Sequence, residues 1–332
     1  MHKLTLLSLV CATLLTTAHA PAQPQTAPKR PGVTTPGVRI PITKLKPEAV
    51  YDFAGAPDWM AVDKEVWVSN SPKNMVARLD PKSAGATTFP VGKHPCSGLA
   101  AGLGSLWVPN CGDSTVTRLD LTDGKTQATF RMTIADSEGG VAIGAGSFWM
   151  LTDTRGTLAR VDPSNNRTVA EIYVAPGSFA VAFGGDAVWI TSTEKNLLTR
   201  VNARTNVIEE TIPVGPKPRF LTVGEGAVWT LNQGDGSISR VDMKTNKVVA
   251  TIEAGIPGGG GEISAGEGSV WATSFEYPIT RIDPSTNKVA QQFFGEGGDS
   301  IRAGLGFVWL TNIRAGTIWR IDPRRITATL AE

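Results

Sequence analysis

Residues 218 to 255 read PRFLTVGEGAVWTLNQGDGSISRVDMKTNKVVATIEAG, and this stretch decides the fold. It holds four short apolar runs, at residues 220–223, 227–231, 237–241 and 248–253, which are separated by turns rich in glycine, aspartate and asparagine. Short apolar runs bounded by such turn residues predict β-strands. Four antiparallel strands, named a to d here, in a unit of about 40 residues are typical of one blade of a β-propeller.

The same unit recurs down the chain, and its marker is a tryptophan. This residue returns at steps of 38 to 42 residues, at Trp67, Trp107, Trp149, Trp189, Trp229, Trp271 and Trp309. An arginine follows each tryptophan 10 or 11 residues later, at Arg78, Arg118, Arg160, Arg200, Arg240, Arg281 and Arg320. The sequence therefore predicts an all-β fold, a seven-bladed β-propeller with four antiparallel strands in each blade.

The constant spacing between tryptophan and arginine has a geometric explanation. If the turn between strands b and c is centred between Gly234 and Asp235, Trp229 and Arg240 lie opposite each other on one face of the sheet. A guanidinium over an indole contributes roughly 0.5–2 kcal/mol through cation–π attraction. We expect the aspartate two residues after the arginine, here Asp242, to hold the guanidinium. Because all seven units repeat the tryptophan–arginine pair, we interpret it as structural.

The two ends of the repeat region suggest how the ring closes. Residues 49–53 resemble a d strand, yet no a, b or c strand precedes them. The last unit ends instead in a shortened apolar run at residues 326–330. We expect the N-terminal segment to supply the outer strand of blade 7, because a closed ring leaves no exposed sheet edge there.

The first 20 residues are typical of a signal peptide. Lys3 gives a positive start, an apolar stretch follows, and Ala18-His19-Ala20 is a small-residue cleavage site. The apolar stretch is too short to span a membrane. A lipid anchor at Cys11 is a weaker alternative, because small residues should precede such a cysteine. We expect a periplasmic or secreted protein.

Residues 21–47 carry seven prolines and little apolar content, which predicts a disordered linker. The propeller is then expected over residues 48–332. The chain has a formal net charge of +2 and no basic run, which argues against nucleic acid as a partner. We expect a monomer whose partner, a small molecule or a protein, binds at the central funnel face.

Two cysteines, Cys96 and Cys111, remain after cleavage. An even number of cysteines in an exported protein suggests a disulfide. Cys96 belongs to the connector into blade 2 and Cys111 to the b–c loop of the same blade, and both features open on one face. We therefore predict a Cys96–Cys111 disulfide, which contributes roughly 3 kcal/mol in the chain-entropy model.

The repeat resembles the seven-bladed propellers of the virginiamycin B lyase and YVTN-type families, over about residues 49 to 330. The resemblance rests on GEGSVW at residues 266–271 and RIDPSTNK at residues 281–288. It implies the same fold, and in the lyase family catalysis by histidine with a glutamate-bound magnesium. That histidine belongs to a Pro-His pair leading into strand a, and the glutamate follows the tryptophan by three residues.

Lined up over the seven repeats, these two positions are named the histidine column and the glutamate column here. This chain departs from the lyase pattern in both. The residues in the histidine column are Asp58, Ser97, Gly139, Phe179, Arg219, Gly261 and Asp299. The residues in the glutamate column are Asn70, Asn110, Thr152, Ser192, Asn232, Ser274 and Asn312. Neither column contains histidine or glutamate, so no catalytic residue is assigned and enzymatic activity stays open.

A site is expected where the repeat becomes irregular. The connectors into blades 3 and 6 are longer than the others, and those into blades 3, 6 and 7 place paired glycines beside a carboxylate. Loops gathered on one face of a rigid scaffold are where binding residues accumulate. The candidate ligand-binding residues are Glu138, Glu262 and Asp299, with Arg219 and Arg302 nearby and His94 and Asp58 on neighbouring connectors. Trp59 and Trp319 fall outside the repeat and are interpreted as packing residues.

Several functions stay open for this face. The first is a binding module without chemistry. The second is a lyase or hydrolase for a cyclic ester-like substrate, with acid–base work by a carboxylate and a histidine or with Ca²⁺ or Mg²⁺ held by the carboxylates. Solvated loop charges without a ligand are the plainest interpretation. A redox propeller with a bound quinone is the weakest, because no residue requires it.

Overall fold

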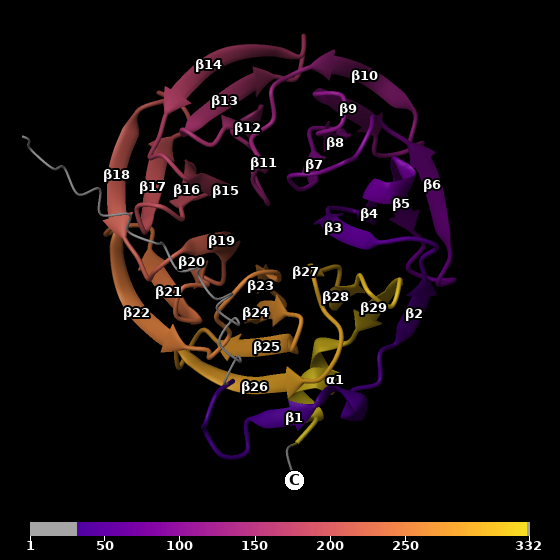
Figure 1. Cartoon of the computed structure of the whole chain (residues 1–332), viewed down its shortest axis with the longest axis vertical. Coiled ribbons are helices and arrows are strands. Elements are labelled where there is room, and N and C mark those ends of the chain that lie inside the picture. Colours follow the sequence, from indigo (N-terminus) through magenta and orange to yellow (C-terminus); the bar gives the residue numbers. More distant parts are fainter. Residues whose placement is uncertain (1–31, 331–332) are drawn as a thin grey trace, which may run out of the picture.

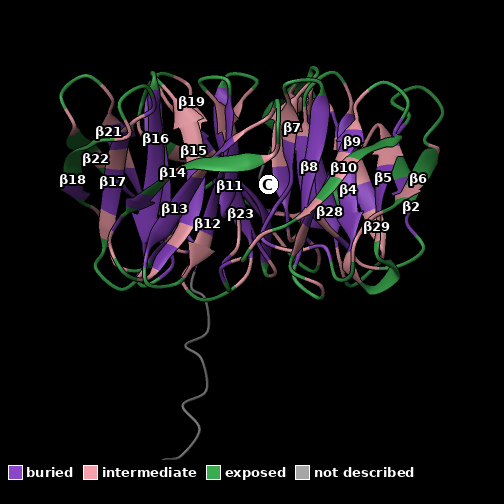
Figure 2. Ribbon diagram, turned by 90° about the horizontal axis from the view of Figure 1, so that it is seen from above, coloured by how far each residue is buried: buried purple, intermediate pink, exposed green. Residues whose placement is uncertain are grey.

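The computed structural model describes residues 32–330, so the predicted signal peptide lies outside the described residues. Seven β-sheets, the blades, are arranged in a ring around a central axis (Figure 1). Six sheets have four strands, and the sheet of blade 6 has five. Seen from the side, the buried strands fill the middle of the disc and exposed loops cover both of its faces (Figure 2). The predicted seven-bladed, all-β fold is confirmed.

The strands of each blade follow one another from the central axis outward. Blades 1 to 4 contain β3 (Pro57–Val62), β4 (Val66–Asn70), β5 (Met75–Leu79) and β6 (Ala86–Pro90); β7 (Ala100–Gly102), β8 (Ser105–Asn110), β9 (Thr115–Asp120) and β10 (Thr126–Arg131); β11 (Val141–Gly144), β12 (Ser147–Asp153), β13 (Thr157–Asp162) and β14 (Arg167–Tyr173); β15 (Ser178–Gly184), β16 (Ala187–Ser192), β17 (Leu197–Asn202) and β18 (Ile208–Pro213). Blades 5 to 7 contain β19 (Pro218–Gly224), β20 (Ala227–Asn232), β21 (Ser237–Asp242) and β22 (Lys247–Glu253); β23 (Glu262–Gly266), β24 (Ser269–Ser274), β25 (Tyr277–Asp283) and β26 (Lys288–Phe294); β27 (Ile301–Gly304), β28 (Phe307–Asn312) and β29 (Thr317–Ile321). A short 3₁₀ helix, η2 (Ser71–Lys73), forms the b–c loop of blade 1.

Each repeat tryptophan lies directly opposite its arginine on the neighbouring strand, in all seven blades. All seven indoles are fully buried. In blades 1 to 5 the guanidinium carbon lies 4.2 to 5.7 Å from the indole centroid, within cation–π range. In blade 7, Arg320 lies over Phe307 instead, at 4.9 Å. The predicted register is confirmed in all seven blades, and the predicted cation–π contact in blades 1 to 5.

The repeat aspartate has a different role from the one expected. Asp242 accepts hydrogen bonds from the backbone amides of Lys244 and Thr245, at 3.0 and 2.7 Å, and so caps its own c–d turn. Those amides need acceptors within the turn, and the carboxylate is the nearest one. Arg240 donates instead to the next blade, to the Pro284 carbonyl and to Asn287 Oδ1, each at 2.7 Å. The prediction that this aspartate holds the arginine is therefore wrong.

The same bridge between blades repeats around the ring. The pairs are Arg118 with Asn166, Arg160 with Asn206 and Arg200 with Asn246, at 2.7 to 3.0 Å. Each of these asparagines has a positive φ, near 60°, at the left-handed position of its turn. Each bridging arginine therefore pairs with the tryptophan of its own blade and ties that blade to the c–d turn of the next.

The ring closes as predicted. β2 (Ala49–Asp52) pairs antiparallel with β29 and forms the outer strand of blade 7. Residues 326–330 do not form a strand, because β2 occupies that edge of β29. They contribute instead to α1 (Pro323–Ala328), which Asp322 caps by accepting a hydrogen bond from Arg324 N. An aspartate cap followed by proline at the first helical position is a helix start signal.

The structure differs from the linker predicted over residues 21–47, of which residues 32–47 are described. β1 (Arg39–Pro41) pairs in parallel with β26 and adds a fifth strand to blade 6, and η1 (Ile42–Lys44) follows it. Val33, Ile40 and Ile42 are buried. These apolar side chains pack on the blade that is already formed, so composition alone did not reveal the segment as ordered.

The predicted disulfide is confirmed. Cys96 and Cys111 are bonded, with their Cα atoms 5.9 Å apart. The bond joins the connector into blade 2 to the b–c loop of that blade, as the shared face of these loops required. Among the described residues, no helix is both long enough and apolar enough to cross a membrane.

Candidate functional site

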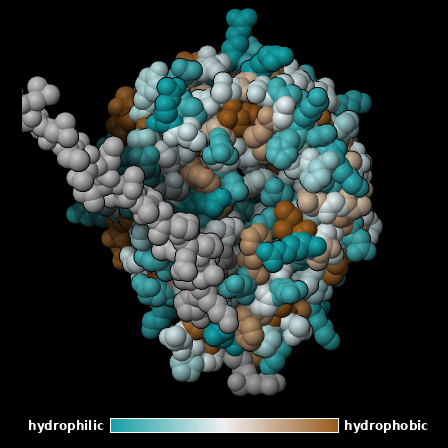
Figure 3. Space-filling view, in the orientation of Figure 1, coloured by the Kyte–Doolittle hydropathy of each residue, from teal (hydrophilic) through white to brown (hydrophobic). Residues whose placement is uncertain are grey.

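The candidate site lies where the inner strands converge on the central axis (Figure 1). The connectors that lead into these strands gather on one face of the disc with the b–c loops. In the space-filling view the middle of this surface is hollowed, and hydrophilic and hydrophobic residues alternate around it (Figure 3). Two adjoining cavities open here, and both take their residues from several blades.

The first cavity, named the acidic pocket here, has a volume of about 250 Å³. It combines four carboxylic side chains with three aromatic rings. The residues lining it are Asp58, Trp59, Glu138, Phe220, Gly260, Gly261, Glu262, Phe275, Asp299 and Ser300. All four acidic residues predicted for the site, from blades 1, 3, 6 and 7, are therefore brought together.

The backbone explains how these carboxyl groups meet. Asp58 is the second residue of β3 and Glu262 is the first of β23, while Glu138 and Asp299 end connectors that lead into inner strands. Gly261 has φ +89°, and a Cβ atom on it would overlap the Thr273 carbonyl oxygen. Only glycine lets this connector press against β24. The irregular glycines therefore fold the connectors inward over the channel.

Asp58 and Asp299 form a coupled carboxyl pair across the boundary between blades 1 and 7. A hydrogen bond joins their side chains. Burial, together with the neighbouring Asp299, Glu138 and Glu262 charges, raises the pKa of Asp58 to about 8. Burial also raises the pKa of Asp299 to about 7, with Glu262 and Glu138 as the next causes. Near neutral pH the pair therefore shares about one proton, held on Asp58.

Glu262 is the most deeply buried of the four, with 4 % of its surface exposed. It pairs with Arg302, accepts a hydrogen bond from the Ser300 hydroxyl, and accepts another from Ile301 N at 3.2 Å. Burial raises the pKa of Glu262, while the Arg302 guanidinium opposes that rise. These contacts fix Glu262 as a rigid wall of the acidic pocket.

Glu138 and Arg219 form an ion pair at 2.5 Å between blades 3 and 5. The Arg219 guanidinium also lies 4.7 Å from the ring centroid of Phe179 and 5.6 Å from that of Phe220. Arg219 and Arg302 therefore each neutralise one carboxylate at the edge of the pocket, as their predicted neighbourhood implied. Among residues 32–330, no basic side chain pairs directly with Asp58 or Asp299, although Arg314 lowers the pKa of Asp299.

His94 does not join the other predicted residues. Its Nδ1 lies 2.6 Å from the Ser71 hydroxyl, its backbone amide donates to Asn74 Oδ1, and it does not line the acidic pocket. The connector that carries it is tied to the outer loop of blade 2 through the Cys96–Cys111 disulfide. A pairing of His94 with the carboxylates is therefore not available in this structure.

The aromatic residues that line the acidic pocket were not predicted from the sequence. Trp59 and Phe220 come from blades 1 and 5, and their ring centroids lie 6.1 Å apart across the channel. Trp59 is buried as predicted, yet it also lines the pocket. The sequence feature that could have revealed these rings is the repeat position directly after the histidine column. Blade 1 has Trp59 there and blade 5 has Phe220, whereas blades 2, 3 and 4 have glycine or alanine.

Comparison with known proteins gives the fold relationship. No family model and no curated protein matches this chain. A streptogramin B lyase structure aligns with a TM-score of 0.69 at 20% identity, over 82% of this chain and 96% of that one. Virginiamycin B lyase from Staphylococcus aureus, as the selenomethionine form, aligns with a TM-score of 0.69 at 17% identity, over 82% and 97%. The chain has the fold of virginiamycin B lyase.

A catalytically inactive histidine-to-alanine variant of the Staphylococcus aureus virginiamycin B lyase, solved with quinupristin, aligns at 18% identity with a TM-score of 0.67. It covers 81% of this chain and 94% of its own. Identities of this size relate the folds alone. The functional groups of this chain must therefore be judged from its own residues.

The column that holds glutamate in the lyase family has a structural role here. Asn232 donates through Nδ2 to the hydroxyls of Ser237 and Ser239, at 3.0 and 2.9 Å, and all three residues are buried. A Cβ atom on Gly215 would collide with the Asn232 amide, so the asparagine packs directly on the connector. Asn312 likewise accepts from Gly298 N at 2.9 Å. Asn232 and Asn312 therefore brace the loops.

Divalent cations need several oxygen ligands at short and regular distances. Within residues 32–330, no group of three or more His, Cys, Asp or Glu side chains is arranged to hold a metal ion. The acidic pocket instead offers one shared proton, three aromatic rings and two arginine-paired carboxylates. This arrangement suits an organic cation, or proton transfer, better than it suits a Ca²⁺ or Mg²⁺ site.

Proposed function

We propose that this chain is an exported propeller that binds a small organic molecule in the acidic pocket through a cationic group of that molecule. The observation that carries the proposal is the Asp58–Asp299 pair, whose hydrogen-bonded carboxyl groups line the same cavity as the rings of Trp59 and Phe220. An ammonium group there allows both carboxylates to ionise, because it supplies the positive charge that the pair lacks. The aromatic rings add cation–π attraction of about 0.5–2 kcal/mol.

Export is part of the same proposal. The signal-peptide pattern at residues 1–20 and the Cys96–Cys111 disulfide support a periplasmic or secreted location. An exported protein meets small molecules at the cell surface, and a loop face on a rigid propeller suits their capture.

Binding of a simple organic cation tests the proposal. We expect benzylamine to bind, benzyl alcohol to bind at least tenfold more weakly, and benzylamine binding to release protons near pH 7.5, because the shared proton leaves the pair. Calorimetric titration in two buffers of different ionisation enthalpy measures affinity and proton release together.

The variants Asp58→Asn and Asp299→Asn should each reduce benzylamine affinity by about tenfold or more, because each removes one ionisable carboxyl group. Asp186→Asn is the matched control, since Asp186 is exposed and has a positive φ that asparagine tolerates. Benzylamine affinity that is the same in both pocket variants as in the unaltered chain would refute the proposal.

A second candidate function is acid–base catalysis by the same pair. The observation in its favour is that one carboxyl is protonated while its neighbour is ionised near neutral pH, as general acid and general base catalysis require. For a cyclic ester-like substrate, Asp299 takes a proton from the carbon next to the one that bears the ester oxygen. A C=C double bond forms between these two carbons as that C–O bond breaks, and Asp58 donates its proton to the leaving carboxylate oxygen.

Quinupristin is the first substrate to test, since the inactive virginiamycin B lyase variant was solved with it. Mass spectrometry separates the outcomes, because elimination leaves the mass of the opened ring unchanged while hydrolysis adds one water. A ring that stays intact over a full day with excess protein argues against this second function for that substrate.

A further inference from the structure

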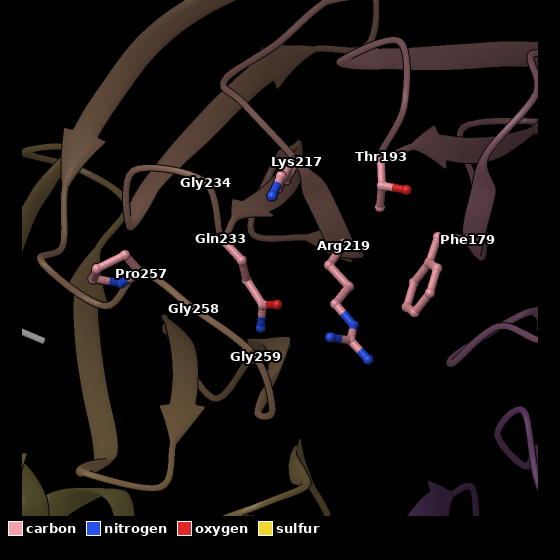
Figure 4. A pocket seen from close by; sticks show the side chains of 9 residues that line it. All are labelled: Phe179, Thr193, Lys217, Arg219, Gln233, Gly234, Pro257, Gly258 and Gly259. Carbon is pink, nitrogen blue, oxygen red and sulfur yellow. The ribbon is translucent and has the colours of Figure 1, made fainter. Parts of the chain in front are cut away.

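A second cavity adjoins the acidic pocket and has the opposite electrostatic character. This basic cavity has a volume of about 490 Å³ and lies between the loops of blades 4, 5 and 6 (Figure 4). Lys217 and Arg219 line it, together with Phe179, Thr193 and Gln233, and no Asp or Glu does. With Arg219 paired to Glu138, the Lys217 ammonium gives the lining residues a net positive charge, and we expect a positive potential in this cavity.

Arg219 has N–H donors other than the one that pairs with Glu138. One terminal nitrogen of its guanidinium pairs with Glu138, while its Nε is buried without a hydrogen-bond partner among the described residues. The other terminal nitrogen points towards Gly259, where an added Cβ atom would lie 3.6 Å from it. This second terminal nitrogen is the donor that an anionic oxygen of a ligand would meet in the basic cavity.

Lys217 is held at the rim of the cavity by its backbone. Its amide donates to Asn196 Oδ1 at 2.8 Å, and its carbonyl accepts from Gln233 N at 3.0 Å. Its backbone has φ +51°, which these two bonds stabilise. No described carboxylate pairs with the Lys217 ammonium, in contrast to Arg219. Lys217 is therefore available to a ligand.

Only a glycine-rich wall separates the two cavities. Gly258 and Gly259 line the basic cavity, while Gly260 and Gly261 line the acidic pocket. Gln233 holds this wall from the basic side, because its side-chain amide donates to the Gly260 carbonyl at 2.6 Å. Arg219 lies at the junction of the two cavities, because it lines the basic cavity and pairs with Glu138 of the acidic pocket.

We infer that the two cavities form one site for an amphoteric organic molecule, with its cationic group in the acidic pocket and a carboxylate in the basic cavity against Arg219 and Lys217. A carboxylate can accept charge-assisted hydrogen bonds from both the second terminal nitrogen of Arg219 and the Lys217 ammonium. The Phe179 ring beside Arg219 offers an apolar surface to the part of the ligand between its charges. This inference rests on the proposed binding function and adds the class of ligand.

Three fragments with one shared ring test the inference by calorimetric titration. Benzylamine carries only the cation, benzoate only the carboxylate, and p-(aminomethyl)benzoate carries both. We expect p-(aminomethyl)benzoate to bind at least about tenfold more tightly than benzylamine. Lys217→Gln should remove most of that advantage and leave benzylamine affinity within about twofold, because Lys217 does not line the acidic pocket.

Lys244→Gln is the matched control, since Lys244 is exposed on a c–d turn outside both cavities. Equal affinities for benzylamine and p-(aminomethyl)benzoate would overturn the amphoteric ligand, while loss of benzylamine binding in Asp299→Asn would still support the proposed function. Benzoate binding that depends on Lys217, with no benzylamine binding at all, would overturn both.

Discussion

Gln291 and Gln292 are consecutive residues of β26 that hold the two ends of the described chain on opposite sides of blade 6. Gln291 donates to the carbonyls of Ile326 and Thr329, at 2.6 and 2.8 Å, and so fixes α1. Gln292 accepts from Val33 N and donates to the Ala254 carbonyl, each at 2.8 Å. Successive side chains of a strand point to opposite faces, which explains this division.

We predict that Gln292→Leu destabilises the fold and frees the segment that includes β1 and η1. The substitution leaves Val33 N and the Ala254 carbonyl buried without partners, at a cost of about 2–4 kcal/mol for the two groups. Trypsin should then cleave after Arg39 or Lys44 at least tenfold faster than in the unaltered protein. Gln291→Leu is the control, because it loosens α1 and should leave these two sites protected. Equal protection in both variants would contradict the assignment.

A second prediction concerns the bridge from blade 5 to blade 6. Arg240→Met should lower the free energy of unfolding by about 2 kcal/mol, because it removes two hydrogen bonds from a charged donor and a cation–π contact. Asn287→Gly keeps the positive φ of that turn and removes only the side-chain amide. A double-mutant cycle measured by denaturant unfolding should give a coupling energy of about 1 kcal/mol. Strict additivity of the two changes would show that the bridge contributes nothing.

The Asp58–Asp299 pair predicts an unusual dependence of stability on pH. Because folding raises both pKa values above the ordinary aspartate value, the folded state binds more protons than the unfolded state between about pH 4 and pH 8. The contribution of the pair to stability is therefore most favourable below about pH 4 and is lost as the pH rises to about 8.

The variant with Asp58→Asn and Asp299→Asn together should consequently have a higher Tm than the unaltered protein at pH 8.5, and nearly the same Tm at pH 4. A gain of roughly 1 kcal/mol corresponds to about 2 °C in a domain of this size. Differential scanning calorimetry across this pH range makes the comparison. A Tm difference that does not change with pH would mean that the two groups have ordinary pKa values.

Loss of the disulfide has a separate and measurable effect. Cys96→Ser with Cys111→Ser should lower stability by roughly 3 kcal/mol, and Tm by about 5 °C, because the unfolded chain regains the freedom of the 15-residue loop. Intact mass after alkylation, with and without reductant, checks that the bond forms. Two alkylated cysteines in the unreduced native protein would contradict the bond.

The blades could be read from the sequence because their signals are local. Each strand is a short apolar run between turn residues, and the fixed step from Trp229 to Arg240 sets the register of strands b and c. Counting the units also predicted the closing strand β2. The partner of Arg240 could not be read in this way, since Asn287 belongs to the next blade and meets it only in the closed ring.

The site was predicted in part. The carboxylates were found because glycine-rich connectors interrupt the repeat. The contact between Asp58 and Asp299 depends on ring closure, and the contact between the Trp59 and Phe220 rings depends on the diameter of the channel. His94 shared the sequence context of the site, but the disulfide loop holds it elsewhere. Local patterns therefore located the loops, and long-range geometry decided which side chains meet.

The position of Asp58 in the first blade and of Asp299 in the last has a consequence for how the site is assembled. During synthesis the ribosome releases almost the entire polypeptide before these two carboxyl groups can approach each other. The pocket is complete only when blades 1 and 7 meet at the seam where β2 pairs with β29. The proposed ligand would bridge that seam, and its binding energy would then oppose separation of blades 1 and 7. Binding in this pocket would therefore also indicate that the propeller ring has closed.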